Sequence, residues 1–502
     1  MMSACNSDST ADSSNEDENG SDNNESATAI VGIAATVETL DPADHRDRTT
    51  ESVLRNIFDG LVRVGEDGEI EPLIAESWEN PTPTEWIFKI KEGIKFHDGS
   101  DLTVDDVVFT FERIINEGAM GGETSPRQGL LGSLEDVEAI DDTSVKFIFE
   151  TPWPIFLKML PHQQIIPKAY LEEVGDEEFR NNPIGSGPFK FVEGNLDERI
   201  ILEKFEDYYN GAPNIDNLVF DVIPETSSRV SALQAGEVHR IHSLSPTLAN
   251  ELSNDPNIEV KDINSTRAYM AEINVNMEPF NNVQVRKALN HAVDMDTIIK
   301  SIFGDYGVRL PGPMLTDSFA HNDELEFYEY DPEKAKQILE EEGIDENFSL
   351  VIDTEEKNKE VAEAIANDLR KVGIDATTRV WDLAVLREML LEGERQMYLG
   401  DWGNSTLDPY DFLNPKLKTD DRGNYSGYNN EKLDELLEAG EKELDEEKRK
   451  EIYYEAQEII YDDAPWIFGY TIKEIEAGQI NLHNWTPTPD AILYMDKATL
   501  NE

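Results

Sequence analysis

Residues 86–99 read WIFKIKEGIKFHDG. Residues 86–90 (WIFKI) are aromatic and β-branched except for Lys89, and Phe88, Lys89 and Ile90 alternate between apolar and polar, which predicts a β-strand. Residues 93–99 predict a turn followed by a short strand. Residues 101–106 (DLTVDD) then predict the start of a helix. Thr103 can cap that helix, and acidic residues in its first turn suit the helix dipole.

Strand and helix patterns alternate on both sides of this segment. Residues 29–37 (AIVGIAATV) form an apolar run of strand length, which indicates a strand buried on both faces. Residues 49–64 show helical spacing, with Gly60 near the end. Further strands are predicted at residues 145–149, 218–222 and 376–380, and further helices at residues 229–235, 284–292, 360–372 and 433–460, the last with a break near Asp445. The pattern as a whole predicts an α/β fold with mixed sheets.

The composition indicates a globular and very acidic protein. The 502 residues favour two or three lobes, and 39% hydrophobic residues are enough to build a core. The chain has 105 Asp and Glu against 43 Lys and Arg, a net charge of −62, which argues against nucleic-acid binding. The acids are spread along the whole chain. Adaptation to high salt or alkaline conditions is the favoured explanation, and an ordinary acidic secreted protein is the alternative.

The N-terminal region suggests a lipid anchor. Cys5 is the only cysteine, so no disulfide can form within the chain. Residues 2–5 (MSAC) resemble the end of a lipoprotein signal, although the charged and apolar segments expected before it are missing. A chance cysteine is the alternative. Residues 6–27 contain alanine as their only apolar residue, which predicts a flexible acidic tether. The sequence contains no run of about 18 apolar residues, so no transmembrane helix is predicted.

No catalytic or metal-binding signature is found in the sequence. The eight histidines form no H-E-x-x-H pattern, and neither a G-x-S-x-G elbow nor a Walker A loop is present. Residues 185–188 (GSGP) contain a G-x-G, but proline stands where a phosphate-binding helix would open, so a tight turn is expected. The sequence therefore predicts a protein that is not an enzyme and has no cofactor or metal.

Several segments form a recognisable series along the chain. They are residues 56–61 (NIFDGL), 72–78 (PLIAESW), 105–109 (DDVVF), 182–189 (NPIGSGPF), 208–213 (YYNGAP), 232–237 (ALQAGE), 279–280 (PF), 283–288 (VQVRKA), 292–294 (AVD), 330–335 (YDPEKA) and 464–467 (APWI). Together with residues 86–99 they resemble the bacterial extracellular solute-binding proteins of family 5. These are the dipeptide-, oligopeptide- and nickel-binding components of ABC importers.

The resemblance implies a two-lobed periplasmic-binding-protein fold of type II, cluster C. Lobe I is expected at residues 28–271 and 471–502, with an inserted subdomain at about 76–185, and lobe II at residues 272–470. Residues 1–27 would be the lipoprotein-type N-terminus and tether. The implied function is capture of a peptide-like solute between the lobes and delivery to ABC permease and ATPase subunits. The protein would act as a lipid-anchored monomer on the extracellular face of the membrane or in the periplasm.

The resemblance also implies where the ligand lies. The family's cleft segment "GWxxDxxDP" corresponds to residues 400–409 (GDWGNSTLDP). The expected ligand-binding residues are Thr36, Glu38, Arg267, Tyr269, Asp401, Trp402, Gly403, Asn404, Ser405 and Asp408.

This segment departs from the family's peptide binders, in which an aspartate at the position of Ser405 grips the ligand's α-ammonium. Asp401, Asp408 or Asp411 could replace it. Residues 353–359 (DTEEKNK) also lack the arginine that some dipeptide binders use for the ligand carboxylate. A glutathione-like ligand, an oligosaccharide, an opine or a metal chelate therefore stays open, and a secreted hydrolase is a distant alternative.

The net charge generates a first prediction. Like-charge repulsion opposes the compact state and is screened by ions. The midpoint of thermal unfolding should therefore rise substantially between low salt and about 1 M potassium chloride. Differential scanning calorimetry would measure the rise, with sucrose as an uncharged control, and an unchanged midpoint would contradict the electrostatic explanation.

Overall fold

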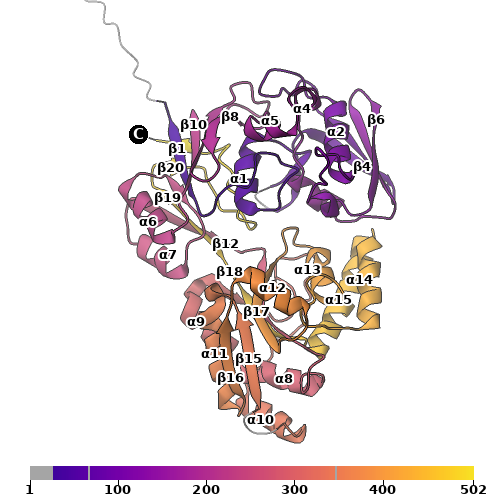
Figure 1. Ribbon diagram of the computed structural model, residues 1–502, viewed down its shortest axis with the longest axis vertical. Coiled ribbons are helices and arrows are strands. Elements are labelled where there is room, and N and C mark those ends of the chain that lie inside the picture. The colour runs from indigo at the N-terminus through magenta and orange to yellow at the C-terminus, as the bar shows by residue number, and fades with distance from the viewer. Residues whose placement is uncertain (1–25, 66–67, 345–347, 502) are drawn as a thin grey trace, which may run out of the picture.

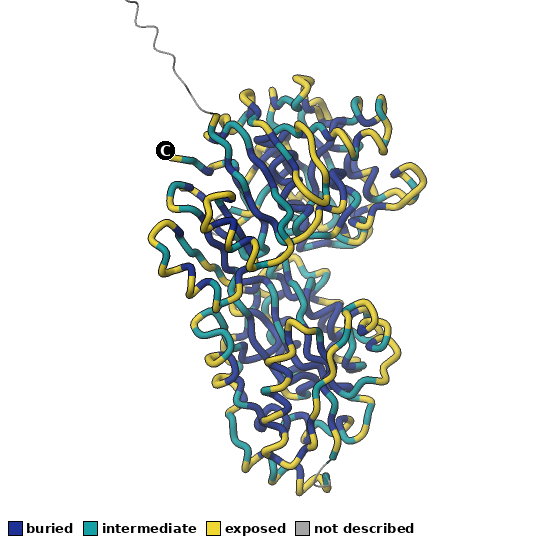
Figure 2. The backbone as a smooth tube through the Cα atoms, turned by 60° about the vertical axis from the view of Figure 1, so that its left-hand side comes forward, coloured by how far each residue is buried: buried dark blue, intermediate teal, exposed yellow. Residues whose placement is uncertain are grey.

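The computed structural model describes residues 26–65, 68–344 and 348–501. Cys5 and nearly all of the predicted tether lie outside these residues. The described chain forms two lobes, each built around a large mixed sheet and its helices (Figure 1). Buried residues gather separately within each lobe (Figure 2). The predicted α/β class is confirmed.

The sheet of lobe I has the strand order β12-β19-β11-β1-β10-β9-β8. Its central strand, β1 (Thr28–Ile33), pairs in parallel with β10 (Asn217–Val222) and β11 (Arg240–Ile241). The other strands are β8 (Phe189–Asn195), β9 (Arg199–Lys204), β12 (Ile258–Ile263) and β19 (Glu474–Gln479), and the helices are α1 (Arg48–Ile57), α4 (Lys168–Val174), α5 (Asp176–Asn181), α6 (Thr226–Ala235) and α7 (Pro246–Leu252). The predicted strand at residues 29–37 is therefore confirmed but ends early, because its pairing with β10 stops at Ile33.

The predicted helix at residues 49–64 is wrong after Ile57. Helix α1 ends at Ile57, and β2 (Val62–Val64) pairs with β3 (Ile70–Pro72). The tight turn at residues 185–188 lies against the end of α1, where the Gly187 backbone N–H donates to the Ile57 carbonyl at 2.9 Å. A Cβ atom at Gly185 would lie 2.1 Å from that carbonyl oxygen. Only glycine fits there, and Phe58 leaves the helix in an extended conformation.

An inserted subdomain carries the segment 86–99. Its four-stranded sheet has the order β4 (Ala75–Thr82), β5 (Glu85–Ile90), β7 (Ser144–Phe149) and β6 (Leu134–Asp141), with α2 (Val104–Ile115) and α3 (Phe156–Met159) packed against it. Asp106 accepts hydrogen bonds from the backbone N–H and the hydroxyl of Thr103, both at 2.8 Å, at the predicted helix start. The expected insert extends to about residue 185, whereas Leu171 and Phe179 of α4 and α5 pack into the lobe I core.

The sheet of lobe II lies at the other end of the molecule. Its strand order is β14 (Gly307–Arg309), β18 (Trp466–Ile472), β13 (Arg267–Ile273), β17 (Met397–Gly403), β15 (Ser349–Thr354) and β16 (Asp375–Val380). Its helices are α8 (Val283–Ala292), α9 (Met295–Phe303), α10 (Pro332–Glu341), α11 (Lys359–Lys371), α12 (Leu383–Leu391), α13 (Pro409–Leu417), α14 (Glu431–Lys442) and α15 (Glu446–Asp463). The predicted break near Asp445 is confirmed, because Asp445 caps α15 and accepts a hydrogen bond from the Lys448 backbone.

The chain crosses between the lobes twice, between β12 and β13 and between β18 and β19. The expected boundaries at residues 271 and 470 therefore fall inside β13 and β18, which belong to the lobe II sheet. Thr266 lies in the first crossover and is 1% exposed. Its backbone N–H donates to the Pro489 carbonyl of lobe I at 3.0 Å, and its own carbonyl accepts from the Asn404 N–H of lobe II at 2.7 Å.

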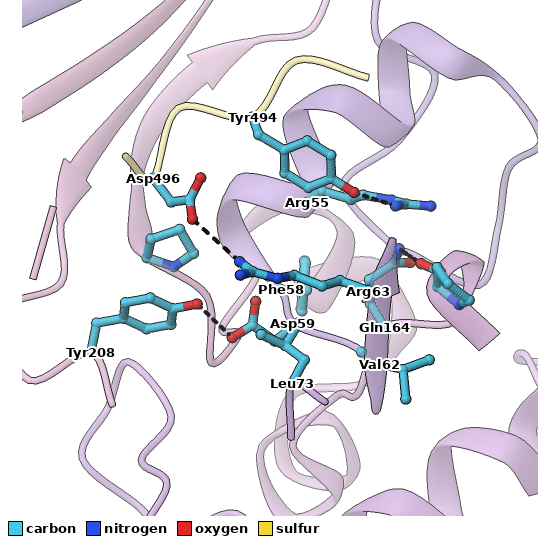
Figure 3. A pocket seen from close by; sticks show the side chains of 13 residues that line it. Arg55, Phe58, Asp59, Val62, Arg63, Leu73, Gln164, Tyr208, Tyr494 and Asp496 are labelled. Atoms are coloured by element: carbon cyan, nitrogen blue, oxygen red, sulfur yellow. Dashed lines mark hydrogen bonds and ion pairs between the residues drawn. The ribbon is translucent and has the colours of Figure 1, made fainter. Parts of the chain in front are cut away.

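A small cavity of about 30 Å³ lies within lobe I (Figure 3). The Asp59 carboxylate at its wall accepts hydrogen bonds from Tyr209 at 2.7 Å and Tyr208 at 3.1 Å. Burial raises the pKa of Asp59 to about 7, although both tyrosine hydroxyls act in the opposite direction. A cavity of this size can hold water but not a peptide. It therefore bears on stability and not on solute capture.

Asp59 generates a pH prediction. An acid whose pKa is raised on folding favours the folded state at low pH, and this contribution is lost as pH rises through the folded pKa. The stability of wild type relative to Asp59→Asn should therefore fall between about pH 4 and pH 8, by roughly 3–4 kcal/mol. Urea unfolding across this range would measure the difference. Asp142→Asn, at an exposed position, is the matched control, and a pH-independent difference would contradict the assignment.

Candidate ligand-binding site

The ends of β13 and β17 bring five of the predicted site residues together at the boundary between the lobes. The antiparallel register pairs Arg267 with Gly403, Tyr269 with Asp401, and Ala268 with Trp402. The Tyr269 ring stacks on Tyr470, with ring centroids 5.0 Å apart. The loop that follows, residues 404–408, leads into α13.

Asp401 is held by two cations of lobe II. Its side chain is 4% exposed and forms ion pairs with Arg267 and, at 2.8 Å, with Lys357. Burial alone would raise the pKa of Asp401, but the two cations outweigh it and hold the pKa below its usual range. Because its charge is already matched, Asp401 has little capacity left for a ligand ammonium.

Asn404 and Asp408 are fully buried beneath the loop. The Asn404 side chain accepts a hydrogen bond from the Asp408 backbone N–H at 3.2 Å and so fixes the loop. Both Asp408 oxygens bind the Arg449 guanidinium, at 2.6 and 2.7 Å. The expected ligand contact is therefore not supported for either residue, since their polar atoms are engaged inside lobe II.

Ser405 and Asp411 form the polar surface of this loop. The Ser405 hydroxyl lies 3.3 Å from an Asp411 oxygen and the Thr406 hydroxyl 3.4 Å from it. Burial raises the pKa of Asp411, against the effect of its hydrogen bonds to Thr406 and Ser405. Among the described residues no cation forms an ion pair with Asp411. Of the three acids in residues 401–411, Asp411 alone forms no ion pair, although Arg422 lowers its pKa from longer range.

Two cations lie near the Trp402 ring. The ring is 5.1 Å from the Lys416 ammonium and 5.0 Å from the Arg422 guanidinium. Lys416 is buried and paired with Glu272, whereas Arg422 is exposed.

Thr36 and Glu38 are exposed in the segment after β1. The Glu38 backbone N–H donates to the Thr50 hydroxyl at 2.9 Å. Burial and the nearby Asp47 raise the pKa of Glu38. In the described structure no hydrogen bond or ion pair joins either residue to the β17 loop, so their ligand contact stays a prediction.

Lobe I approaches the loop through other residues. The Trp153 ring of the insert meets Tyr410 edge-on, with centroids 4.7 Å apart, and the Lys158 ammonium lies 5.5 Å from the Phe319 ring. Arg48 donates to the Thr266 hydroxyl at 3.2 Å. Arg48 and Trp153 are not among the predicted site residues, because no local sequence pattern marks them. Asp411 carries only a weak signal, as an acid in a first helical turn.

Over residues 26–65, 68–344 and 348–501, no group of three or more acidic, histidine or cysteine side chains is placed to hold a metal ion. Within the same ranges, no helix is both long and apolar enough to span a membrane.

Comparisons with curated proteins show close sequence relatives. Heme-binding protein A of Haemophilus influenzae is 31% identical over 432 residues, covering 80% of this chain and 78% of the relative. The glutathione-binding protein GsiB of Pectobacterium atrosepticum is 28% identical over 492 residues, covering 94% of both chains.

Solved structures share the fold. The ABC transporter substrate binding protein CtaP of Listeria monocytogenes superposes with a TM-score of 0.88 at 28% identity, covering 95% of this chain and 100% of that one. The periplasmic binding protein DppA of Helicobacter pylori, in complex with the peptide STSA, gives a TM-score of 0.80 at 28% identity, covering 95% and 98%. The two-lobed type II fold is thereby confirmed. Residues 69–424 match the model of the bacterial extracellular solute-binding proteins, family 5 Middle, and the chain belongs to this family.

Proposed function

We propose that this protein is the substrate-binding component of an ABC importer, and that its solute is peptide-like with a free amino group. The solute would lie between the lobes, against residues 401–411, and pass to the permease when the lobes open. Binding without turnover fits a family of solute-binding proteins. Hinge closure around a ligand is a usual way for such two-lobed proteins to act.

Asp411 carries the proposal of an amine. Asp401 pairs with Arg267 and Lys357, and Asp408 with Arg449, so neither leaves a free charge. Asp411 accepts hydrogen bonds from two hydroxyl groups and forms no ion pair within the described residues, while Arg422 and Arg48 act on it only from longer range. A carboxylate that a ligand covers without supplying a cation is costly. A ligand ammonium would supply that cation through charge-assisted hydrogen bonds.

The relatives are named for ligands of different chemistry, including heme, glutathione and a peptide. Peptides and glutathione carry an α-amino group and heme does not. Ser405 and Thr406 stand where the family's peptide binders carry an aspartate. This difference keeps glutathione among the proposed ligands.

The cellular setting follows from the family, whose members are extracellular or periplasmic solute-binding proteins. We propose that Cys5 is lipidated and that the protein acts as a monomer. Because β1 begins at Thr28, a tether ending at residue 27 would join lobe I directly at its central sheet.

Calorimetry with trialanine, glutathione and their N-acetyl derivatives tests the proposed amine. Acetylation should cost about 2–5 kcal/mol, because it leaves the Asp411 carboxylate buried and unpaired. Asp411→Asn should weaken binding of the ligand with a free amine. It should also reduce the difference in binding free energy between the free and the acetylated ligand. Asp420→Asn, at an exposed position on the same lobe, is the control. Equal affinity for free and acetylated ligands would contradict the proposal.

Trp402 should report ligand entry, because it lies on the strand that leads into the loop and close to the exposed Arg422. Trp402→Phe should lose most of the ligand-induced change in fluorescence. Trp485→Phe should keep it, since Trp485 is 1% exposed in the lobe I core. If the Trp402→Phe protein retains the full change, the ligand lies elsewhere.

A further inference from the structure

Arg48 lies at the lobe boundary, and its guanidinium group donates hydrogen bonds to neutral groups. It is the first residue of α1 in lobe I, and it donates to the Asp490 carbonyl at 2.9 Å and to the Thr266 hydroxyl at 3.2 Å. Among the described residues no carboxylate forms an ion pair with it. Buried arginines elsewhere, such as Arg240 with Glu476, bind a carboxylate directly.

Two other buried arginines, Arg229 and Arg286, also bind mainly carbonyl groups, but the surroundings of Arg48 differ from theirs. Arg229 and Arg286 each contact carbonyls within the interior of one lobe. Arg48 instead lies where the lobes meet, beside a second arginine. Burial and that arginine, Arg267, both lower the pKa of Arg48.

Gly403 shows how closely the two guanidinium groups approach one position. A Cβ atom at Gly403 would lie 3.2 Å from Nη2 of Arg48 and 3.7 Å from Nη2 of Arg267. Gly403 has no side chain, so these nitrogens flank a backbone position at the end of β17. The two arginines come from opposite lobes, Arg48 from α1 and Arg267 from β13.

Among the three cations at this position, Arg48 alone forms no ion pair with a described residue. Arg267 pairs with Asp401, and Lys357 pairs with Asp401 and Glu355. Glu474, Asp490 and Asp411 raise the pKa of Arg48 from longer range, without an ion pair to it.

We infer that Arg48 and Arg267 together bind a carboxylate of the solute, bridging the two lobes across Gly403. The inference rests on the proposed function and adds a second recognition element to it. Guanidinium groups present donors in a geometry that suits a carboxylate, and charge-assisted hydrogen bonds are about twice as strong as neutral ones. With the amine at Asp411, the solute is a zwitterion with a free amine and a free carboxylate.

The pair Arg48 and Arg267 also supplies the carboxylate-binding group that residues 353–359 lack. The expected carboxylate-binding arginine is absent there. Arg267 is partly exposed, with 33% of its side chain accessible. It binds Asp401 through Nη1, so the Nη2 beside Gly403 can donate to an incoming anion. An anion bound to both arginines favours the closed arrangement, because it cancels their mutual repulsion.

The first experiment compares trialanine with trialanine amide by calorimetry, on wild type and Arg48→Gln. Amidation should weaken binding to wild type at least tenfold. Arg48→Gln should weaken the binding of trialanine by a similar factor and leave the binding of trialanine amide nearly unchanged. Arg199→Gln, which removes an exposed guanidinium paired with Asp221 at the edge of lobe I, is the matched control. Equal weakening of both ligands by Arg48→Gln means that Arg48 only holds the hinge, and this overturns the inference.

A second experiment needs no peptide. Sodium acetate replaces sodium chloride at constant ionic strength while the midpoint of thermal unfolding is measured. Acetate should raise the midpoint of wild type and Arg199→Gln more than that of Arg48→Gln, and Arg48→Lys should fall between them. Identical responses in all four proteins overturn the inference. If acetate gives the expected pattern but neither trialanine nor glutathione binds, the proposed peptide-like solute is wrong while the anion site stands.

Discussion

Three hydrogen bonds at Thr266 fix how the two lobes meet. Its backbone binds Pro489 of lobe I on one side and Asn404 of lobe II on the other, and its hydroxyl accepts from Arg48. The residue is nearly inaccessible to solvent, so water cannot readily replace these bonds. Thr266 therefore holds together the β17 loop, α1 and the C-terminal segment. The geometry of the site between the lobes depends on these contacts.

The interior of this acidic protein depends on a small number of basic residues. Arg113 binds Asp41, Arg449 binds Asp408, and Lys416 binds Glu272, all within buried surroundings. Removing one partner of such a pair leaves an uncompensated charge, which is far more costly than losing an exposed pair. Each of these three buried acids is thus matched by a cation. Against this background, the groups at the lobe boundary that form no ion pair among the described residues stand out as places for a ligand.

The sequence predicted local structure well where the pattern was complete in itself. The strand at residues 86–90, the helix start at Thr103 and the break at Asp445 each depend on neighbouring residues only. The helix over residues 49–64 failed because its end is determined by Gly185 and Gly187, which lie more than 120 residues away and pack against Ile57.

The same distinction applies to the site. Arg267, Asp401 and Trp402 meet because β13 and β17 pair, which the resemblance to a family implied. The role of Asp408 could not be predicted, since its partner Arg449 lies 41 residues further on in another helix. Arg48 reaches Gly403 only in the folded chain. Which acid forms an ion pair is decided by such distant partners and not by the loop itself.

The C-terminal strand β19 lies between β11 and β12 in the lobe I sheet. The lobe I sheet therefore becomes continuous only when β19 pairs with β11 and β12, which precede it by more than 200 residues in the chain. Until residues 474–479 are available, β12 and β11 have no common neighbour, and the crossover that ends at β13 is not anchored on the lobe I side. A prematurely terminated chain could fold lobe II almost completely and still lack a working hinge. Solute binding between the lobes therefore requires residues 474–479 as well as the residues that line the site.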